Sequence, residues 1–245
     1  MDTCHPLRGT PRPHTGRVRK QRFLATAWVP LLVAGCAFRS ADGGDSTTTS
    51  YASTTSTVPA SAIPAVWPSS GIFFARPDDA ANEFIRTVLE VAPRLGAQRQ
   101  ITDDRVELDV LVGEDVGTAV VKSTLAMRRF RADGGWFVTS ATNEHVTIEW
   151  PDAGAIVPRE TLEVRGVARG FEGQVSISVF HPDDPTAPID TASVIAGSRA
   201  ASEPYRASLD ISDVRSGSVL AFLVRGGRGL EQDPGEFTAI FVTAG

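Results

Sequence analysis

Cysteine and histidine are scarce in this chain. Its 245 residues include two cysteines, Cys4 and Cys36, and four histidines. Two thiols are too few for a cysteine-based zinc cluster, and they do not suffice for the disulfide framework of a small secreted domain. Aromatic residues account for only 7% of the chain, whereas 22 glycines and 16 prolines favour short strands joined by turns. The length is sufficient for a hydrophobic core without covalent links.

The basic residues are almost all arginines, as in GC-rich, actinobacterial-type genomes, and six of the 24 lie in residues 1–22 beside the single acid Asp2. An apolar run over residues 23–35 follows, and it is too short to span a bilayer as a stop-transfer helix. A basic flank, a short apolar centre and small residues after it are typical of a secretory signal peptide. Residues 33–36 at the end of the run read Val-Ala-Gly-Cys.

This tetrapeptide resembles the lipobox of bacterial lipoproteins, although Leu is more usual than Val at its first position. The resemblance implies cleavage between Gly35 and Cys36 and a diacylglyceryl group on the Cys36 thiol. The lipid would hold the mature protein on the extracytoplasmic face of the cell membrane, where stable anchoring needs more than one acyl chain. An ordinary secretory signal, or an uncleaved anchor with a chance cysteine, is the alternative. Translation from Val18 would give a leader of conventional length.

Removal of residues 1–35 leaves 18 basic and 28 acidic residues, and therefore a net charge near −10. A surface this acidic is a poor partner for nucleic acid or for anionic lipid headgroups. We therefore expect no nucleic-acid partner, and a membrane contact made only through the lipid on Cys36. The mature chain would keep one cysteine, so we expect no intramolecular disulfide.

Residues 36–69 are predicted to form a disordered tether. Residues 46–57 read STTTSYASTTST, and three prolines follow before residue 69. Such a composition does not bury enough apolar surface to offset the entropy lost on ordering. The tether would separate the folded part of the chain from the membrane.

Residues 70–144 predict a small α+β domain in which one helix packs on an antiparallel meander. Asp78 and Asp79 follow Pro77, as at a helix start, and Pro93 is expected to end the helix. Apolar residues recur at helical spacing between them. Alternating segments at residues 106–112, 120–131 and 136–141 predict strands. Helix and sheet together are typical of an α+β unit.

Residues 145–245 predict an immunoglobulin-like β-sandwich, so the fold class expected for the whole chain is α+β followed by all-β. Seven short apolar runs with turn residues between them are typical of such a sandwich. The runs occupy residues 146–150, 162–164, 175–180, 189–195, 205–211, 219–224 and 237–242. The glycine-rich segment 226–229 is interpreted as a turn and not as a phosphate-binding loop, because no helix follows it.

Three segments of this region show a more particular pattern. Residues 151–154 read Pro-Asp-Ala-Gly, residues 161–168 read TLEVRGVA, and residues 171–175 read FEGQV. With the final strand after residue 233, they make residues 145–243 similar to the immunoglobulin-like domain of bacterial spore-germination proteins. Trp150 and the segment 157–159 depart from that family's pattern. Its members occur widely on lipoproteins, so the resemblance implies a fold and not a germination role, and it implies no catalytic residues.

The motif residues in these segments have structural interpretations. They are Pro151, Gly154, Gly166, Phe171, Glu172 and Gly173. Gly173 is expected to adopt a positive φ in a tight turn, and Gly166 is expected at a bulge or a close approach of two backbones. Phe171 is predicted to close one end of the sandwich, with stacking on a ligand as the alternative.

Catalytic and metal-binding patterns are weak. His145 and His181 are the only histidines after the signal. His145 is interpreted as a solvated residue at the start of a strand, and not as a base that reaches a nucleophile. The loop from His181 to Pro185 offers too few ligands for a closed metal site. Acidic pairs at 78–79, 103–104 and 114–115 fall at helix starts or turns, where such residues are expected. Arg128, Arg129 and Arg131 are interpreted as a solvated strand end, with contact to an anionic wall polymer as the alternative.

These observations predict a non-enzymatic envelope lipoprotein that binds or scaffolds an envelope protein or a cell-wall glycan, with no cofactor and no metal. A small-ligand carrier is the alternative, with an apolar cleft in the α+β domain lined by Phe84, Val88, Leu108 and Trp136. The competing interpretation of these four residues is that they form the core of that domain. A wall-modifying hydrolase is a third hypothesis.

Overall fold

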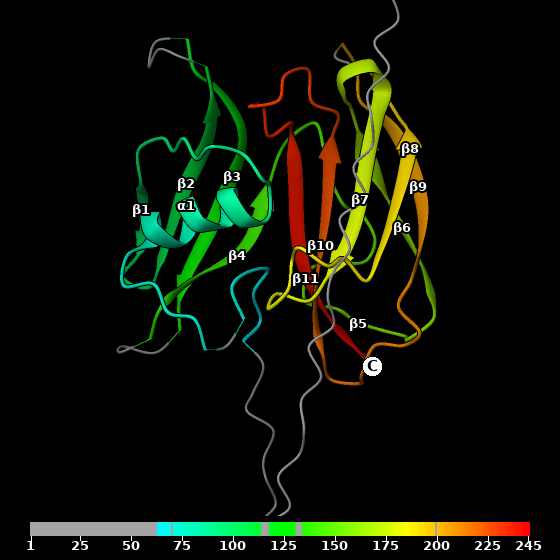
Figure 1. Cartoon of the computed structure of the whole chain (residues 1–245), viewed down its shortest axis with the longest axis horizontal. Coiled ribbons are helices and arrows are strands. Elements are labelled where there is room, and N and C mark those ends of the chain that lie inside the picture. Colours follow the sequence, from blue (N-terminus) through cyan, green and yellow to red (C-terminus); the bar gives the residue numbers. More distant parts are fainter. Residues whose placement is uncertain (1–62, 70, 114–117, 131–133, 199) are drawn as a thin grey trace, which may run out of the picture. The chain divides into compact units, whose positions relative to one another are not determined.

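The computed structural model describes residues 63–69, 71–113, 118–130, 134–198 and 200–245 (Figure 1). Residues 1–62 lie outside the described residues. They include the predicted signal peptide, the predicted cleavage site between Gly35 and Cys36, the predicted lipidation site Cys36 and most of the predicted tether. In the described part, the chain is mostly antiparallel β-sheet with one α-helix and a 3₁₀ turn.

The helix α1, Pro77–Thr87, begins where the sequence predicts, with proline in its first turn and Asp78 and Asp79 near the positive end of its dipole. It ends earlier than predicted, six residues before Pro93. The chain leaves the helix after Thr87, and Glu90 adopts a left-handed φ of 56°. No helix among the described residues is both long and apolar enough to cross a membrane.

Four antiparallel strands form a meander beside α1. They are β1 Arg99–Thr102, β2 Arg105–Val112, β3 Val120–Arg129 and β4 Trp136–Thr142. The last three agree with the predicted segments, whereas β1, whose four residues are all exposed, shows no apolar alternation and was not predicted. The buried residues of β2 alternate along the strand and face α1.

Order begins before the end of the predicted tether. Ala65, Val66 and Trp67 are buried, and Trp67 forms an antiparallel bridge with Val138 of β4. The Trp67 ring also packs against Phe84 of α1, with ring centroids 6.5 Å apart. The prediction of a disordered segment up to residue 69 is therefore corrected at its end, because this short apolar segment gains backbone pairing and core contacts.

The C-terminal strands form two layers, as a β-sandwich requires. Strands β7, β8, β10 and β11 lie in one layer, and β6 and β9 lie in the other, where residues 147–150 hydrogen-bond to β6. A buried apolar cluster fills the space between the layers. The bounds are β5 Ile156–Val157, β6 Thr161–Ala168, β7 Gln174–Phe180, β8 Asp190–Ile195, β9 Glu203–Asp210, β10 Val219–Gly226 and β11 Phe237–Ala244, with the 3₁₀ turn at Phe171–Gly173.

Strand β11 joins the meander to the sandwich. One of its edges pairs with β10 along seven registered residue pairs, and the other pairs with β4 through Ala239 and Ala141 and with β5 further along (Figure 1). The buried Ser123 hydroxyl of β3 lies within hydrogen-bonding distance of the carbonyls of Phe237 (2.8 Å) and Thr142 (2.9 Å). One continuous sheet therefore runs from β1 to β8.

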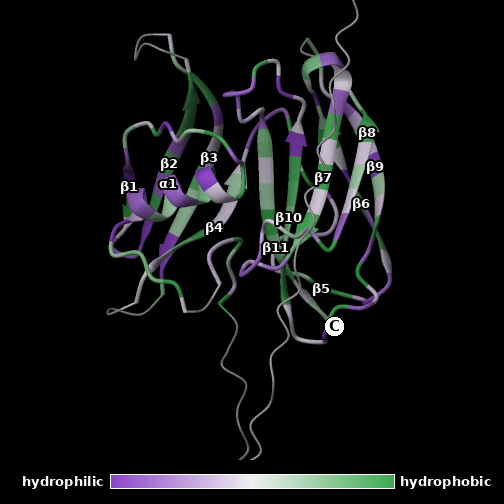
Figure 2. Cartoon of the chain, viewed as in Figure 1, coloured by the Kyte–Doolittle hydropathy of each residue, from purple (hydrophilic) through white to green (hydrophobic). Residues whose placement is uncertain are grey.

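The core around α1 draws on both predicted domains. Phe180, Leu223 and Phe237 from the sandwich strands are buried in the same cluster as Phe84 and Ile85 of α1. Figure 2 shows β10 and β11 as apolar along most of their length. This follows from their position, because one face of these strands packs in the sandwich core and the other packs in the α1 core.

Two glycines adopt the roles that their positions in the sequence predict. Gly173 has a φ of 74° in the 3₁₀ turn before β7. Gly166 lies on β6 where the backbone of residue Thr147 approaches closely, and a Cβ atom at this position would be 2.1 Å from the Thr147 carbonyl oxygen. Only glycine fits there without movement of the backbone.

We expect Gly166→Ala to lower the free energy of unfolding by about 1–3 kcal/mol, since the added methyl overpacks a rigid backbone contact. The measurement is chemical denaturation of the full chain. Gly96→Ala is the control, because its Cβ would have its nearest neighbour at 3.3 Å, at the Asp109 Cβ. Equal stability of the two variants would contradict the steric account.

Candidate functional site: an arginine-lined groove on the sandwich

The face of the sheet that packs on α1 is buried at β11 and becomes exposed toward β8. Cross-strand neighbours share a face, and the row through Ser193, Ser176, Arg225 and Phe237 crosses four strands. Phe237 is fully buried, whereas Ser176 and Ser193 are exposed. The sheet is therefore covered over β11, β10 and the Phe180 end of β7, and uncovered over β8 and the start of β7.

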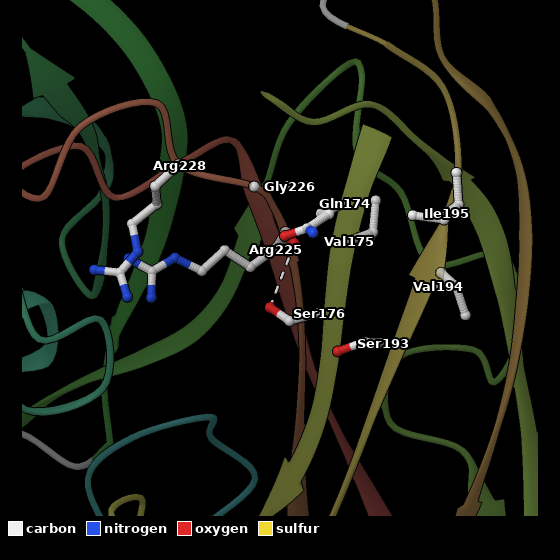
Figure 3. Close-up of a pocket in the computed structure, with 10 residues that line it drawn as sticks. Gln174, Val175, Ser176, Ser193, Val194, Ile195, Arg225, Gly226 and Arg228 are labelled. Atoms are coloured by element: carbon white, nitrogen blue, oxygen red, sulfur yellow. Dashed lines mark hydrogen bonds between the residues drawn. The ribbon is translucent and has the colours of Figure 1, made fainter. Parts of the chain in front are cut away.

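A groove with a volume of about 470 Å³ lies on this uncovered part (Figure 3). We call it the β7–β8 groove. Its lining residues come from β7, β8, the end of β10 and the loop after β10: Gln174, Val175, Ser176, Ser193, Val194, Ile195, Arg225, Gly226, Gly227 and Arg228. Hydroxyl, amide and guanidinium groups thus share one concave surface with Ile195, whose side chain is largely exposed.

Arg225 is fixed by the backbone on both sides of its guanidinium. Its Nε donates to the carbonyl of Pro234, and its Nη2 donates to the carbonyl of Leu89 at 3.1 Å. Burial is the main cause that lowers the pKa of Arg225 to about 10, and the neighbouring charge of Arg228 lowers it further. The carboxylates of Glu90 and Asp233 oppose this effect. Arg225 remains charged at neutral pH, and its side chain is held in place.

Arg228 stands beside Arg225 on the loop that follows β10. In Figure 3 the two side chains end beside each other, on the side of β10 away from Ser176 and Ser193, and their like charges interact. Arg228 is exposed, and within the described ranges no carboxylate forms an ion pair with it. The groove therefore has an excess of positive charge at one end.

Two ion pairs hold the base of this loop. Lys122 of β3 contacts Asp233 at 2.9 Å, and Arg169 makes a bidentate contact with Glu236 at 2.6 and 2.7 Å. All four side chains are mostly buried. Asp233 also accepts a hydrogen bond from the Gly235 backbone. Groups from the meander and from the sandwich therefore fix the loop that carries Arg228.

The four residues predicted to line an apolar cleft lie in the α1 core. Phe84, Leu108 and Trp136 are buried, and Val88 packs against the same cluster. None of them lines the β7–β8 groove or the other pockets described on this part of the chain. Their positions correspond to the competing interpretation, in which they form the core.

The family-motif residues lie at turns and close contacts. Pro151 and Gly154 belong to the turn between residues 147–150 and β5, and Gly154 has a φ of 78°. Glu172 has a φ of 57° in the 3₁₀ turn. Phe171 at the start of that turn is 41% exposed and lines a small pocket beside Arg169, so its ring is only partly buried, and its role at one end of the sandwich stays a prediction. Gly173 in the same turn is buried.

The residues considered for catalysis or metal binding have local partners. His145 Nε2 lies 3.0 Å from a Glu144 oxygen, and the backbone carbonyl of His181 accepts a hydrogen bond from the Asp184 N–H in its own loop. Hydrogen bonds from Thr102 and Arg128 lower the pKa of Asp104. Within the described part of the chain, no group of three His, Cys, Asp or Glu residues is placed to hold a metal ion. The acidic pair at 114–115 lies outside the described residues.

The arginines that the sequence suggested for anion contact are engaged elsewhere. Arg128 pairs with Asp104 at 3.4 Å and lies over the Phe130 ring, and Arg129 lies over the Trp136 ring. Arg131 lies outside the described residues. Arg128 and Arg105 also line a pocket of about 320 Å³ on the meander, whereas the β7–β8 groove is lined by Arg225 and Arg228. The sequence prediction placed Arg228 in a turn and Arg225 directly after a strand. In the sequence, the only feature that marks this region is Arg228, the basic residue within the glycine-rich segment 226–229.

Comparison of the chain with protein-family models, with curated proteins and with solved structures finds no match.

The ion pair between Arg169 and Glu236 makes the free energy of unfolding depend on pH in the acidic range. Burial alone would raise the pKa of Glu236, but the hydrogen bond and charge of Arg169, with His145 and Lys122 nearby, lower it below the unfolded value. A carboxyl whose folded pKa is depressed contributes stability above its unfolded pKa of about 4.5 and loses it as the pH falls through the folded pKa.

We expect Glu236→Gln to lower the free energy of unfolding at pH 7 by about 1–3 kcal/mol, because Arg169 loses a charged hydrogen-bond partner in a mostly buried position. The loss should shrink as the pH falls below 4.5, and denaturation at several pH values measures it. Glu163→Gln is the control, since Glu163 is exposed and pairs with the exposed Arg206. A deficit that is the same at all pH values would contradict this account.

Proposed function

We propose that this protein is a non-enzymatic, membrane-anchored lipoprotein of the cell envelope whose C-terminal sandwich binds an envelope protein or a cell-wall glycan. The observation that carries the proposal is the β7–β8 groove, which is polar, concave and open on a face that is otherwise covered. Hydroxyl and amide groups on β7 and β8, and guanidinium groups on β10 and the loop after it, offer hydrogen bonds to a polar ligand. A rigid sheet holds them in fixed relative positions.

We also propose that the sandwich is immunoglobulin-like and that a helix-on-meander unit extends it. Residues 147–150 pair with β6 in one layer, and β5 then pairs in parallel with β11 in the other layer. The segment from residue 147 to residue 157 thus pairs with strands of both layers. This pairing supports the immunoglobulin-like arrangement that the sequence resemblance implies. The meander adds its strands at the free part of the β11 edge.

Small-ligand carriage in the helix-on-meander unit would need space where the core now lies. Phe84 is fully buried, and its ring packs against those of Trp67 and Phe237. The groove on the sandwich is open without any such rearrangement. We therefore place the binding function there.

The binding proposal is tested with the full chain and isolated cell envelopes. We expect Ser193→Tyr to abolish sedimentation of the protein with envelopes, because the phenol would fill the groove. Ser208→Tyr is the matched control, since Ser208 is exposed on β9 in the other layer. Point variants are preferred to deletion of residues 145–245, which would also strip Phe180 and Phe237 from the α1 core. Equal binding by the two variants would refute a role for the groove.

The anchoring proposal rests on the lipobox-like segment 33–36. We expect Cys36→Ser to move the protein from the membrane fraction to the soluble fraction or the medium, because the acyl chains supply the membrane affinity. Cys4→Ser is the control, since Cys4 lies in the predicted signal. Metabolic labelling with a fatty-acid analogue reports the lipid directly. Membrane retention of the Cys36→Ser variant would contradict lipid anchoring.

A further inference from the structure

We infer that the β7–β8 groove recognises a phosphate or carboxylate group carried on a glycan chain, and that Arg225 and Arg228 bind this group. The inference rests on the proposed function, because it names the ligand class of the same groove. It adds the chemical feature that the ligand must carry and the two residues that select for it.

Positive charge is in excess at the end of the groove. Arg225 donates to two backbone carbonyls, and Arg228 has no ion-pair partner among the residues of the described ranges. By contrast, Arg169 near the same loop and Arg206 on β9 each contact a carboxylate. Two neighbouring cations raise each other's free energy, and an anion bound between them removes that cost.

Carboxylates near the site do not fill this role. Asp233 is already bound by Lys122 and by the Gly235 backbone. Glu90, on the segment after α1, acts on Arg225 only through its charge, and no ion pair joins the two residues. The positive end of the groove is therefore available to an external anion.

The two arginines are also held in place before a ligand binds. A guanidinium presents a planar set of donors that matches the oxygens of a phosphate or a carboxylate. Arg225 is pinned by Pro234 and Leu89, so little side-chain entropy remains to be lost on binding. The ion pairs of Asp233 and Glu236 fix the loop that carries Arg228.

The rest of the groove lies on β7 and β8, on the other side of the Arg225 backbone from the guanidinium groups. There Gln174, Ser176 and Ser193 present side-chain donors and acceptors, and Ile195 adds exposed apolar surface. Hydroxyl and amide groups suit the hydroxyl groups of a sugar. The groove volume of about 470 Å³ is within the range of roughly 300–1,000 Å³ of small-ligand sites. An anionic glycan uses both parts of the surface.

The chain as a whole is acidic, and this affects how a polyanion can bind to it. A net charge of −5 for the whole chain, or near −10 without residues 1–35, gives no long-range attraction for a polyanion. Binding must therefore come from direct contact at the two arginines, and removal of one of them should have a large effect.

The test uses the full chain in detergent and three fluorescent probes: an oligogalacturonate, which carries carboxylates, a polyphosphate chain, and neutral dextran. We expect at least one of the anionic probes to bind and dextran not to bind. Arg228→Gln should weaken binding by roughly ten- to a hundredfold, as expected for a lost charged hydrogen-bond partner. Arg206→Gln is the matched control, since it removes the same charge from an exposed site on the other layer.

The two anionic arms separate the chemistries: binding of polyphosphate alone identifies a phosphate, and binding of oligogalacturonate alone identifies a carboxylate. Failure of both probes, equal binding of dextran, or equal affinity of Arg228→Gln and Arg206→Gln would overturn the inference. If Ser193→Tyr abolishes envelope binding and Arg228→Gln leaves it unchanged, the groove is the binding site and this inference is wrong. If Ser193→Tyr binds envelopes normally, the proposed function itself fails.

A stability measurement excludes a merely structural role for Arg228. Without ligand, we expect the melting temperature of Arg228→Gln to equal or exceed that of the unchanged chain, because Arg225 loses a like-charged neighbour. A bound anion should raise the melting temperature of the unchanged chain and not that of the variant. A lower melting temperature of the variant without ligand would show that Arg228 stabilises the fold, against the inference.

Discussion

Pairing of β11 along both of its edges is the constraint on which the rest of the structure depends. One edge bonds to β10, and the other is shared by β4 and β5. Its alternate residues also serve different cores, with Ile240 and Val242 in the sandwich and Phe237 and Ala239 beside α1. Because both edges and both faces are occupied, a shift of this strand would disturb every layer.

The groove follows from where this shared sheet is covered and where it is not. The helix and the segments around it cover β11, β10 and the Phe180 end of β7 but leave β8 and the start of β7 open, where serine and glutamine lie on this face. Arg225 lies on the last strand before the uncovered part and ties it to Leu89 and Pro234. The positive end of the groove thus lies at the edge of the α1 core.

Local pattern was a good guide to single elements. The strands β2, β3, β4, β7, β9, β10 and β11 follow segments whose apolar residues alternate or cluster, and α1 begins at Pro77 as expected. Short or fully exposed pieces such as β1 and β5 carry no such signal, since their stability comes from pairing with neighbouring strands. The early end of α1 and the burial of Val66 and Trp67 also arise from contacts distant in the sequence.

The sequence by itself determined the β-rich class, the α1 start and the glycines at positions where a side chain does not fit, because these depend on local sterics and periodicity. Only the tertiary structure decided that one sheet spans both predicted domains and that Phe84, Leu108 and Trp136 lie in a shared core. The tertiary structure also decided the surroundings of the arginines. Arg128 and Arg129 contact Asp104 and Trp136 within the meander, whereas Arg225 and Arg228 lie next to each other at the end of the β7–β8 groove. Pairing of charges depends on distances in space, and these are set only when the strands have assembled.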